Sequence, residues 1–214
     1  MLELLIIDKK MEVIMKLTYH GHSCFILDVD GYKIALDPYH EVPGYPDLSI
    51  EANEVLPSHD HFDHAFVEAV KLTSKARPEG LKIIEIHSFH DPEGGKLRGE
   101  NTLRIFEYKG VRIMHAGDIG VHPTAEQTEL MKNLDVLLIP TGGTFTFDEK
   151  ESKAFAEEIG AKVVVPMHYR NGEYGFEPTS TLEDFTKQYD KVNYAEGTVE
   201  FTGKEEPQVL VFKF

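Results

Sequence analysis

The chain has 214 residues and carries 37 acidic against 22 basic side chains, which gives a formal net charge of −15. This excess of negative charge opposes phosphate backbones, so we expect no nucleic-acid partner. No apolar run approaches the roughly 20 residues of a membrane-spanning helix, so we expect no membrane insertion. The single cysteine, Cys24, excludes an intrachain disulfide and fits a reducing compartment, so we predict a cytoplasmic protein.

The length and a hydrophobic content of 41% predict one folded domain over residues 1–214. Residues 1–15 admit two interpretations. They are either a detachable N-terminal extension or a first strand at the edge of a sheet.

In the first half of the chain, short apolar segments separated by turn residues predict hairpins. Asp30-Gly31 and Lys109-Gly110 are typical hairpin turns. One segment, residues 65–75, has helical spacing, with its apolar residues near one face. Residues 90–100 form a glycine-rich loop. The predicted strands are residues 16–19, 24–29, 32–36, 54–56, 82–87, 102–108 and 111–114.

The second half alternates between helices and strands. Helices are predicted over residues 124–132, 150–159 and 179–189, and strands over residues 136–139, 162–165, 192–194 and 209–212. Hairpins followed by alternating elements indicate an α/β protein with mixed sheets covered by helices.

The segment Ser58-His59-Asp60-His61-Phe62-Asp63-His64 indicates a metal site. It offers four strong ligands, His59, His61, Asp63 and His64, within six residues. Imidazole and carboxylate are donors that borderline divalent metals accept. Residues two apart in an extended loop project to the same side, so His59 and His61 can share one ion. The alternative is a solvated, histidine-rich surface turn.

Matching donors recur later and weaken that alternative. His90, Asp118 and His168 each follow an apolar strand. Side chains at successive strand ends converge on one edge of a sheet, where α/β proteins bind ligands.

This pattern resembles the metallo-β-lactamase fold superfamily over nearly the whole chain after Met15. The opening Tyr19-His20-Gly21-His22-Ser23 and the run His115-Ala116-Gly117-Asp118 look most like a small branch that includes ascorbate-6-phosphate lactonase and related metal-dependent hydrolases. The resemblance implies a four-layer αβ/βα sandwich of two mixed β-sheets flanked by helices.

The resemblance also implies a ligand set for two divalent ions. His59, His61 and His90 would hold the first, and Asp63, His64 and His168 the second. Asp118 would bridge both ions, and Asp37 would orient a ligand. Zinc is the expected metal, with manganese and iron as alternatives. Because position 61 is His and not Glu, the chain departs from the di-iron oxidoreductase relatives.

Several histidines leave alternatives open. His87 competes with His90 for the third histidine position, and we favour His90 because it stands where the strand ends. His20 and His22 either line the site or stabilise a turn. His115 is expected to be buried support for Asp118, and Cys24 a small core residue.

The expected reaction is hydrolysis of an ester, lactone or phosphodiester bond in a small metabolite by a hydroxide shared between two metals. Asp63 or Asp118 would accept a proton. Expected substrate contacts are an anion clamp at Arg98, backbone amides at Gly143, and the side chains of Asn101 and Tyr169.

Two other functions stay open at this stage: a phosphodiesterase or nuclease acting on nucleic acid, and a non-catalytic metal-binding protein. Seven protein ligands for two ions leave room for water, which favours catalysis over a closed structural site. The sequence does not specify the oligomeric state.

Overall fold

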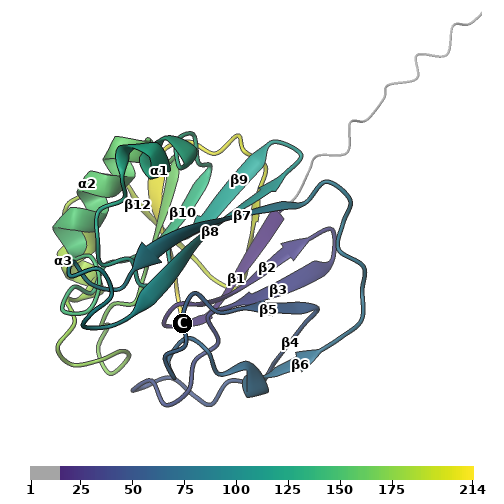
Figure 1. Cartoon of the computed structure of the whole chain (residues 1–214), viewed down its shortest axis with the longest axis horizontal. Coiled ribbons are helices and arrows are strands. Elements are labelled where there is room, and N and C mark those ends of the chain that lie inside the picture. The colour runs from purple at the N-terminus through teal and green to yellow at the C-terminus, as the bar shows by residue number, and fades with distance from the viewer. Residues whose placement is uncertain (1–14) are drawn as a thin grey trace, which may run out of the picture.

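The computed structural model describes residues 15–214, and its arrangement is shown in Figure 1. The prediction for residues 1–15 lies outside the described residues except at Met15, which begins the first strand. The strands are β1 Met15–Gly21, β2 Cys24–Val29, β3 Tyr32–Leu36, β4 Ile50–Ala52, β5 Glu54–Leu56, β6 Val70–Leu72, β7 Lys82–Phe89, β8 Glu100–Tyr108, β9 Val111–His115, β10 Val136–Pro140, β11 Val163–Met167, β12 Val192–Ala195, β13 Thr198–Phe201 and β14 Gln208–Phe212. The helices are the short 3-10 helix η1 Val67–Ala69 and the α-helices α1 Ala125–Leu130, α2 Glu149–Ile159 and α3 Leu182–Thr186.

Two mixed sheets form the body of the protein. The first has the strand order β13-β1-β2-β3-β5, and the second has the order β12-β14-β11-β10-β9-β8-β7. Both predicted hairpins, β2–β3 and β8–β9, pair in antiparallel register, as in Phe25 with Leu36 and Tyr108 with Val111. The predicted α/β sandwich of two mixed sheets is confirmed.

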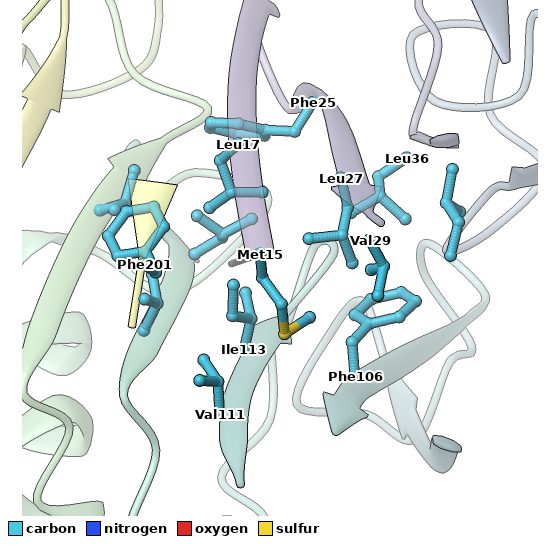
Figure 2. Close-up of a cluster of buried hydrophobic side chains, with 14 of the residues drawn as sticks. Met15, Leu17, Phe25, Leu27, Val29, Leu36, Phe106, Val111, Ile113 and Phe201 are labelled. Carbon is cyan, nitrogen blue, oxygen red and sulfur yellow. The ribbon is translucent and has the colours of Figure 1, made fainter. Parts of the chain in front are cut away.

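The main core lies between the two sheets. Alternate residues of β1 and β2, such as Leu17 and Leu27, point inward and meet Phe106 and Ile113 of the second sheet (Figure 2). All four side chains are fully buried. The period-two alternation of these strands therefore decides which face joins the core.

The three α-helices pack on the outer face of the second sheet (Figure 1). Each begins with a capping box; in α2, Asp148 accepts hydrogen bonds from the backbone N–H groups of Lys150 and Glu151. Phe155 of α2 and Phe185 of α3 are buried in the cluster that covers this face. Because this sheet is covered on both sides, β10 and β11 are continuously apolar and fully buried.

The helix predicted over residues 65–75 is wrong. The segment forms η1 and then β6, which pairs in parallel with β4. Its apolar residue Val70 packs against Ile26 and Ala35 on the outer face of the first sheet. Pairing between distant segments thus overrides local helical spacing. The third helix is shorter than predicted because Thr181 is its N-cap. The sequence analysis also missed β4, β6 and β13.

The sheet order places the ends of six strands at one edge. β1 and β3 run parallel to β5 in the first sheet, and β7 and β9 run parallel to β11 in the second. Polar residues follow each of these six strands at its carboxyl end. Among the described residues, no helix is long and apolar enough to cross a membrane.

Candidate metal centre

The histidine-rich loop after β5 folds back on itself. The backbone N–H groups of His64 and Ala65 both donate to the carbonyl of His61, at 3.0 and 2.8 Å, and this turn separates the two ends of the motif. On one side, His59 Nε2 lies 3.0 Å from His61 Nδ1. On the other side, Asp63 and His64 are buried. The motif thus presents two sets of donors, as its spacing predicted.

Asp37, which follows β3, orients two histidines of this loop: His64 directly and His59 through Ser58. Its fully buried carboxylate accepts hydrogen bonds from the Ser58 backbone at 2.6 Å and the Ser58 hydroxyl at 2.7 Å, and it lies 2.8 Å from His64 Nδ1. Ser58 Oγ in turn lies 2.9 Å from His59 Nδ1. Both rings therefore direct Nε2 away from Asp37, which is the expected arrangement.

The structure separates His90 from His87. His90 is buried, and its Nε2 lies 2.9 Å from Asp118 Oδ2. His87, which is still within β7, is exposed and packs edge-on against Phe89. Since strand side chains alternate between faces, His87 points away from the edge where the donors gather.

Asp118 lies at the centre of the cluster. Its Oδ2 atom is 3.2 Å from both His64 Nε2 and His168 Nε2, and 4.0 Å from His59 Nε2. The preceding residue, Gly117, has a φ of +50°, and a side chain there would collide with Asn101 and Ser58. Glycine at this position lets the chain turn tightly enough to bring Asp118 between the two donor sets.

The donor atoms fall into three groups that share residues. One group contains His59, His61 and His90; another contains His22, Asp63, His64 and His168; the third contains His59, His64 and Asp118. Within each group, the donor atoms lie within 4.8 Å of one another. The structure therefore brings together all seven residues of the predicted ligand set, and it adds His22.

The cluster fits a cation better than a hydrogen-bonded polar core. His64 Nε2 and Asp118 Oδ1 are buried and have no hydrogen-bond partner. Unpaired buried polar atoms are costly, and groups of this kind with converging donors are typical of ion sites. The nitrogen and oxygen donors match the preferences of zinc, manganese and iron.

The charges of the donors are set by burial and by one another. Burial opposes ionisation of Asp118, but His168 and His64 outweigh it and hold the pKa of this carboxyl well below its usual range. Burial lowers the pKa of His59 to about 3 and that of His22 to about 4, so both imidazoles are neutral. Although burial opposes it, the neighbouring Asp118 raises the pKa of His64. The ionised carboxylates and the neutral imidazoles of His59 and His22 suit a divalent ion, whereas His64 would release a proton when an ion binds.

His115 is buried support, as expected. Its Nε2 lies 3.0 Å from the carbonyl of Ser23, and its Nδ1 accepts a hydrogen bond from the Gly117 backbone at 3.1 Å. The ring therefore connects the first sheet to the turn that carries Asp118.

A cavity of about 290 Å³ opens onto the cluster. Arg98 contributes a basic side chain to its wall, and the Arg98 guanidinium lies 4.1 Å above the ring of Phe145. The other lining residues are His61, Phe62, Asp63, His90, Asp118, His168 and Phe176. The sequence analysis did not predict that Phe62, Phe145, Phe176 and Arg98 line one cavity, because these residues come from four separate loops.

Asp91 fixes the loop that carries Arg98, and the sequence analysis missed it. One carboxylate oxygen accepts from the backbone of Glu93 and Gly95, and the other accepts from Leu97 and Arg98. The sequence feature that could have indicated this role is an acidic residue directly before a glycine-rich loop, since the backbone N–H groups of such a loop need acceptors.

Three expected substrate contacts are placed elsewhere. Asn101 is fully buried; its amide donates to the Ala116 carbonyl, and its Oδ1 accepts from the Asp118 backbone. Gly143 donates its N–H to the Phe147 carbonyl at 3.1 Å, so this group is not free to bind an oxyanion. Tyr169 lines a separate hollow with Tyr45 and Tyr174. Asn101 therefore positions Asp118, Gly143 forms a turn with a φ of +62°, and Tyr169 points away from the cluster.

Two mixed sheets with histidine and aspartate donors gathered at one edge are typical of a metal-binding class of proteins, and a comparison with known families leads to the same class. The model of the beta-lactamase superfamily domain matches residues 16–168, so the chain belongs to this superfamily. The matched region contains all the donors described above.

Similar proteins are named as hydrolases. A UPF0173 metal-dependent hydrolase from Methanoregula boonei is 30% identical over 190 residues, covering 74% of this chain and 84% of its own length. A UPF0173 protein from Pyrococcus furiosus is 30% identical over 201 residues, covering 83% and 91%. A crystal structure from Thermotoga maritima, described as a candidate zinc-dependent hydrolase of the metallo-beta-lactamase superfamily, has a TM-score of 0.73 and 33% identity, covering 92% of this chain and 98% of that one. The prediction that the chain is a hydrolase of this superfamily is confirmed.

Proposed function

We propose that the chain is a dinuclear metal hydrolase that cleaves an ester or lactone bond in a small, anionic metabolite. His59, His61 and His90 would hold one ion, Asp63, His64 and His168 the other, and Asp118 would contact both. The observation that carries this proposal is the position of Asp118 Oδ2, 2.9 Å from His90 Nε2 on one side and 3.2 Å from His64 and His168 on the other.

The donor chemistry favours zinc. Each ion would have imidazole nitrogens as its main ligands with carboxylate oxygen added, which suits zinc and also admits manganese and iron. The related Thermotoga maritima protein is described as a candidate zinc-dependent hydrolase.

The bound ions would supply a water of lowered pKa and a polarising charge on the bond that is cleaved. The chain itself would supply the proton acceptor. Asp63 and Asp118 face the cavity, and both carboxyl groups have a lowered pKa because the attraction of neighbouring histidines outweighs their burial. Both are ionised at neutral pH, as ligands of a divalent ion must be; the lowered pKa makes each a weak base, so its role as proton acceptor rests on its position at the cavity.

The cavity supports a small substrate with a negatively charged group. Its volume of about 290 Å³ accommodates a small metabolite. Arg98 is a cation in its wall, held over the Phe145 ring at 4.1 Å, and its guanidinium would bind a carboxylate or phosphate. Phe62 and Phe176 would contact the apolar part of the substrate. A phosphorylated lactone, as in the branch that the sequence resembles, has this chemistry.

Metal analysis with a matched pair of histidine variants tests the dinuclear centre. We expect two ions per chain in the purified protein, a clear loss of metal in His90→Ala, and no change in His87→Ala, since His87 is exposed on the same strand. Fewer than two ions in the wild type, or equal effects of the two variants, would refute the centre.

A panel of esters, lactones and phosphodiesters, each in an anionic and a neutral form, tests the substrate class. Arg98→Met should raise KM for the anionic ester or lactone by roughly tenfold or more, as expected for a charged hydrogen bond, and leave the neutral form unchanged. Lys96→Met, in the same loop but not among the residues that line the cavity, is the control. Turnover confined to phosphodiesters would contradict the proposed bond type, and equal effects on the two forms would contradict the role of Arg98.

A further inference from the structure

His22 lies among the donors of the second ion, although the ligand set of the superfamily resemblance does not include it. It follows β1 at the same edge as the other donors, and its side chain is 1% exposed. Its neighbour two positions earlier, His20, lies on the outer face of the first sheet in a polar hollow. The two histidines of the opening motif therefore lie in different places: His20 on the outer face of the first sheet and His22 in the donor cluster.

The imidazole of His22 is directed at the second ion's donors. Its Nε2 lies 3.3 Å from Asp63 Oδ2, and its ring centroid lies 4.2 Å from that of His168. The donor atoms of His22, Asp63, His64 and His168 all lie within 4.8 Å of one another, and all four residues are buried. Donor atoms must converge in this way to reach a single ion.

The backbone holds His22 in this position at a cost. His22 has a φ of +54°, a conformation that residues with a side chain adopt rarely. Its carbonyl accepts hydrogen bonds from the His168 backbone at 3.3 Å and from the Tyr19 hydroxyl at 3.2 Å, which fix the turn. Strained residues of this kind concentrate at functional sites, because the surrounding structure must compensate for the strain.

The side chain does not stabilise the turn. A histidine that stabilises a turn hydrogen-bonds to the backbone of that turn, whereas His22 Nδ1 is buried and has no partner. Glycine or asparagine would adopt the left-handed backbone more readily. The imidazole therefore needs another reason to be here, and the atoms that it faces are metal donors.

We infer that His22 is an additional ligand of the second ion, which would then have His22, Asp63, His64 and His168 around it together with Asp118. This inference rests on the proposed dinuclear centre. It makes the second ion the more enclosed of the two and leaves the first, which the half-exposed His61 would hold, as the more accessible to water.

The competing explanation is that His22 only holds Asp63 by a hydrogen bond. A glutamine can replace such a bond, because its amide also donates to a carboxylate, but it is a poor ligand for zinc or cobalt. His22→Asn and His22→Gln therefore separate the two roles. Asparagine also tolerates the left-handed backbone. His20→Asn is the matched control, since it changes the same residue type outside the cluster.

The test is a titration of metal-free protein with Co²⁺ alone, followed by visible absorption and by proton NMR of the paramagnetically shifted, exchangeable ring N–H signals. In the wild type and in His20→Asn we expect two bound ions. In His22→Asn and His22→Gln we expect unchanged affinity at the first site, at least about tenfold weaker binding at the second, and one shifted N–H signal fewer.

The outcomes are distinct. Unchanged first-site affinity shows that a variant is folded. Second-site affinity equal to wild type in either His22 variant, or an unchanged number of shifted signals, would overturn the assignment of His22. Failure of the wild type itself to bind two ions would instead overturn the proposed dinuclear centre.

Discussion

The two halves of the donor cluster are built differently. The half formed by His59, His61 and His90 includes the half-exposed His61, whereas all four residues of the half formed by His22, Asp63, His64 and His168 are buried; both halves contribute residues to the cavity wall. The open half comes from one loop and from β7, which is the last strand of its sheet; the buried half includes residues that follow β1 and β11, which have neighbours on both sides. The difference leaves the open half the more accessible to solvent, chiefly through His61.

The largest expected effect joins the two halves. Asp118→Asn keeps the shape of the side chain but removes the charge that both halves contact, so both ions should be lost. We expect hydrolysis to fall by more than the about 100-fold that loss of an outer partner costs a metal site. Metal content and turnover should be measured with Asp60→Asn, an exposed position in the same loop, as the control. Retention of both ions would show that the halves are independent.

The next largest effect is expected from Asp37 and Ser58, which hydrogen-bond to the donors and should affect the metal affinities of the two halves differently. Asp37→Asn weakens the acceptor of His64 Nδ1, and Ser58→Ala removes the contact to His59 Nδ1. We expect Asp37→Asn to weaken the buried half by roughly 10- to 100-fold, with a smaller effect on the open half through Ser58. Ser58→Ala should weaken the open half most, with a smaller effect on the buried half, because the Ser58 hydroxyl also donates to Asp37. Stepwise metal titrations check this order, and the reverse pattern would contradict it.

Two histidines, one in each half, should respond in opposite ways to pH in the metal-free protein. Burial lowers the pKa of His59 to about 3, so the unfolded chain binds this proton first as the pH falls below about 6.5, and the stability contributed by neutral His59 is lost towards pH 3. The pKa of His64 is raised despite its burial, chiefly by Asp118, so its contribution is lost as the pH rises above about 6.5.

Urea denaturation of metal-free wild type and His59→Asn between pH 6.5 and 4 measures the first of these components. The wild-type free energy of unfolding should fall more steeply, by at most about 1.4 kcal/mol per pH unit, the limit for one proton. Parallel slopes in the two proteins would contradict the lowered pKa of His59.

The smallest effect is expected at the rim of the open half. Phe62 lines the cavity and is 56% exposed. Phe62→Ala should raise KM a few-fold, about 1 kcal/mol of lost apolar contact, and leave metal content unchanged. A large fall in kcat would show instead that the ring positions the reacting groups.

The predictions of individual elements succeeded where local chemistry dominates. The turns at Asp30-Gly31 and Lys109-Gly110 connect β2 to β3 and β8 to β9, and the segment from His59 to His64 divides its donors as its spacing indicated. The prediction for residues 65–75 was wrong because the apolar spacing fits a helix, whereas pairing with β4 and packing on the first sheet stabilise a strand. Arg98 lines the cavity, and its contact with substrate stays a prediction, whereas Asn101, Gly143 and Tyr169 lie elsewhere, because proximity in sequence does not determine which way a side chain or an N–H group points.

The sequence by itself determined the superfamily, the two sheets with their hairpins, and the identity of seven candidate donors, because turn residues, apolar alternation and dense histidine motifs are local signals. Only the tertiary structure decided that His90 and not His87 joins the cluster, that His22 lies beside Asp63 from a strand 41 residues away, and that Asn101 supports Asp118. These choices depend on the direction of each strand and on which of its faces a side chain occupies. Both are set when strands pair in space, and no single segment of the sequence encodes them.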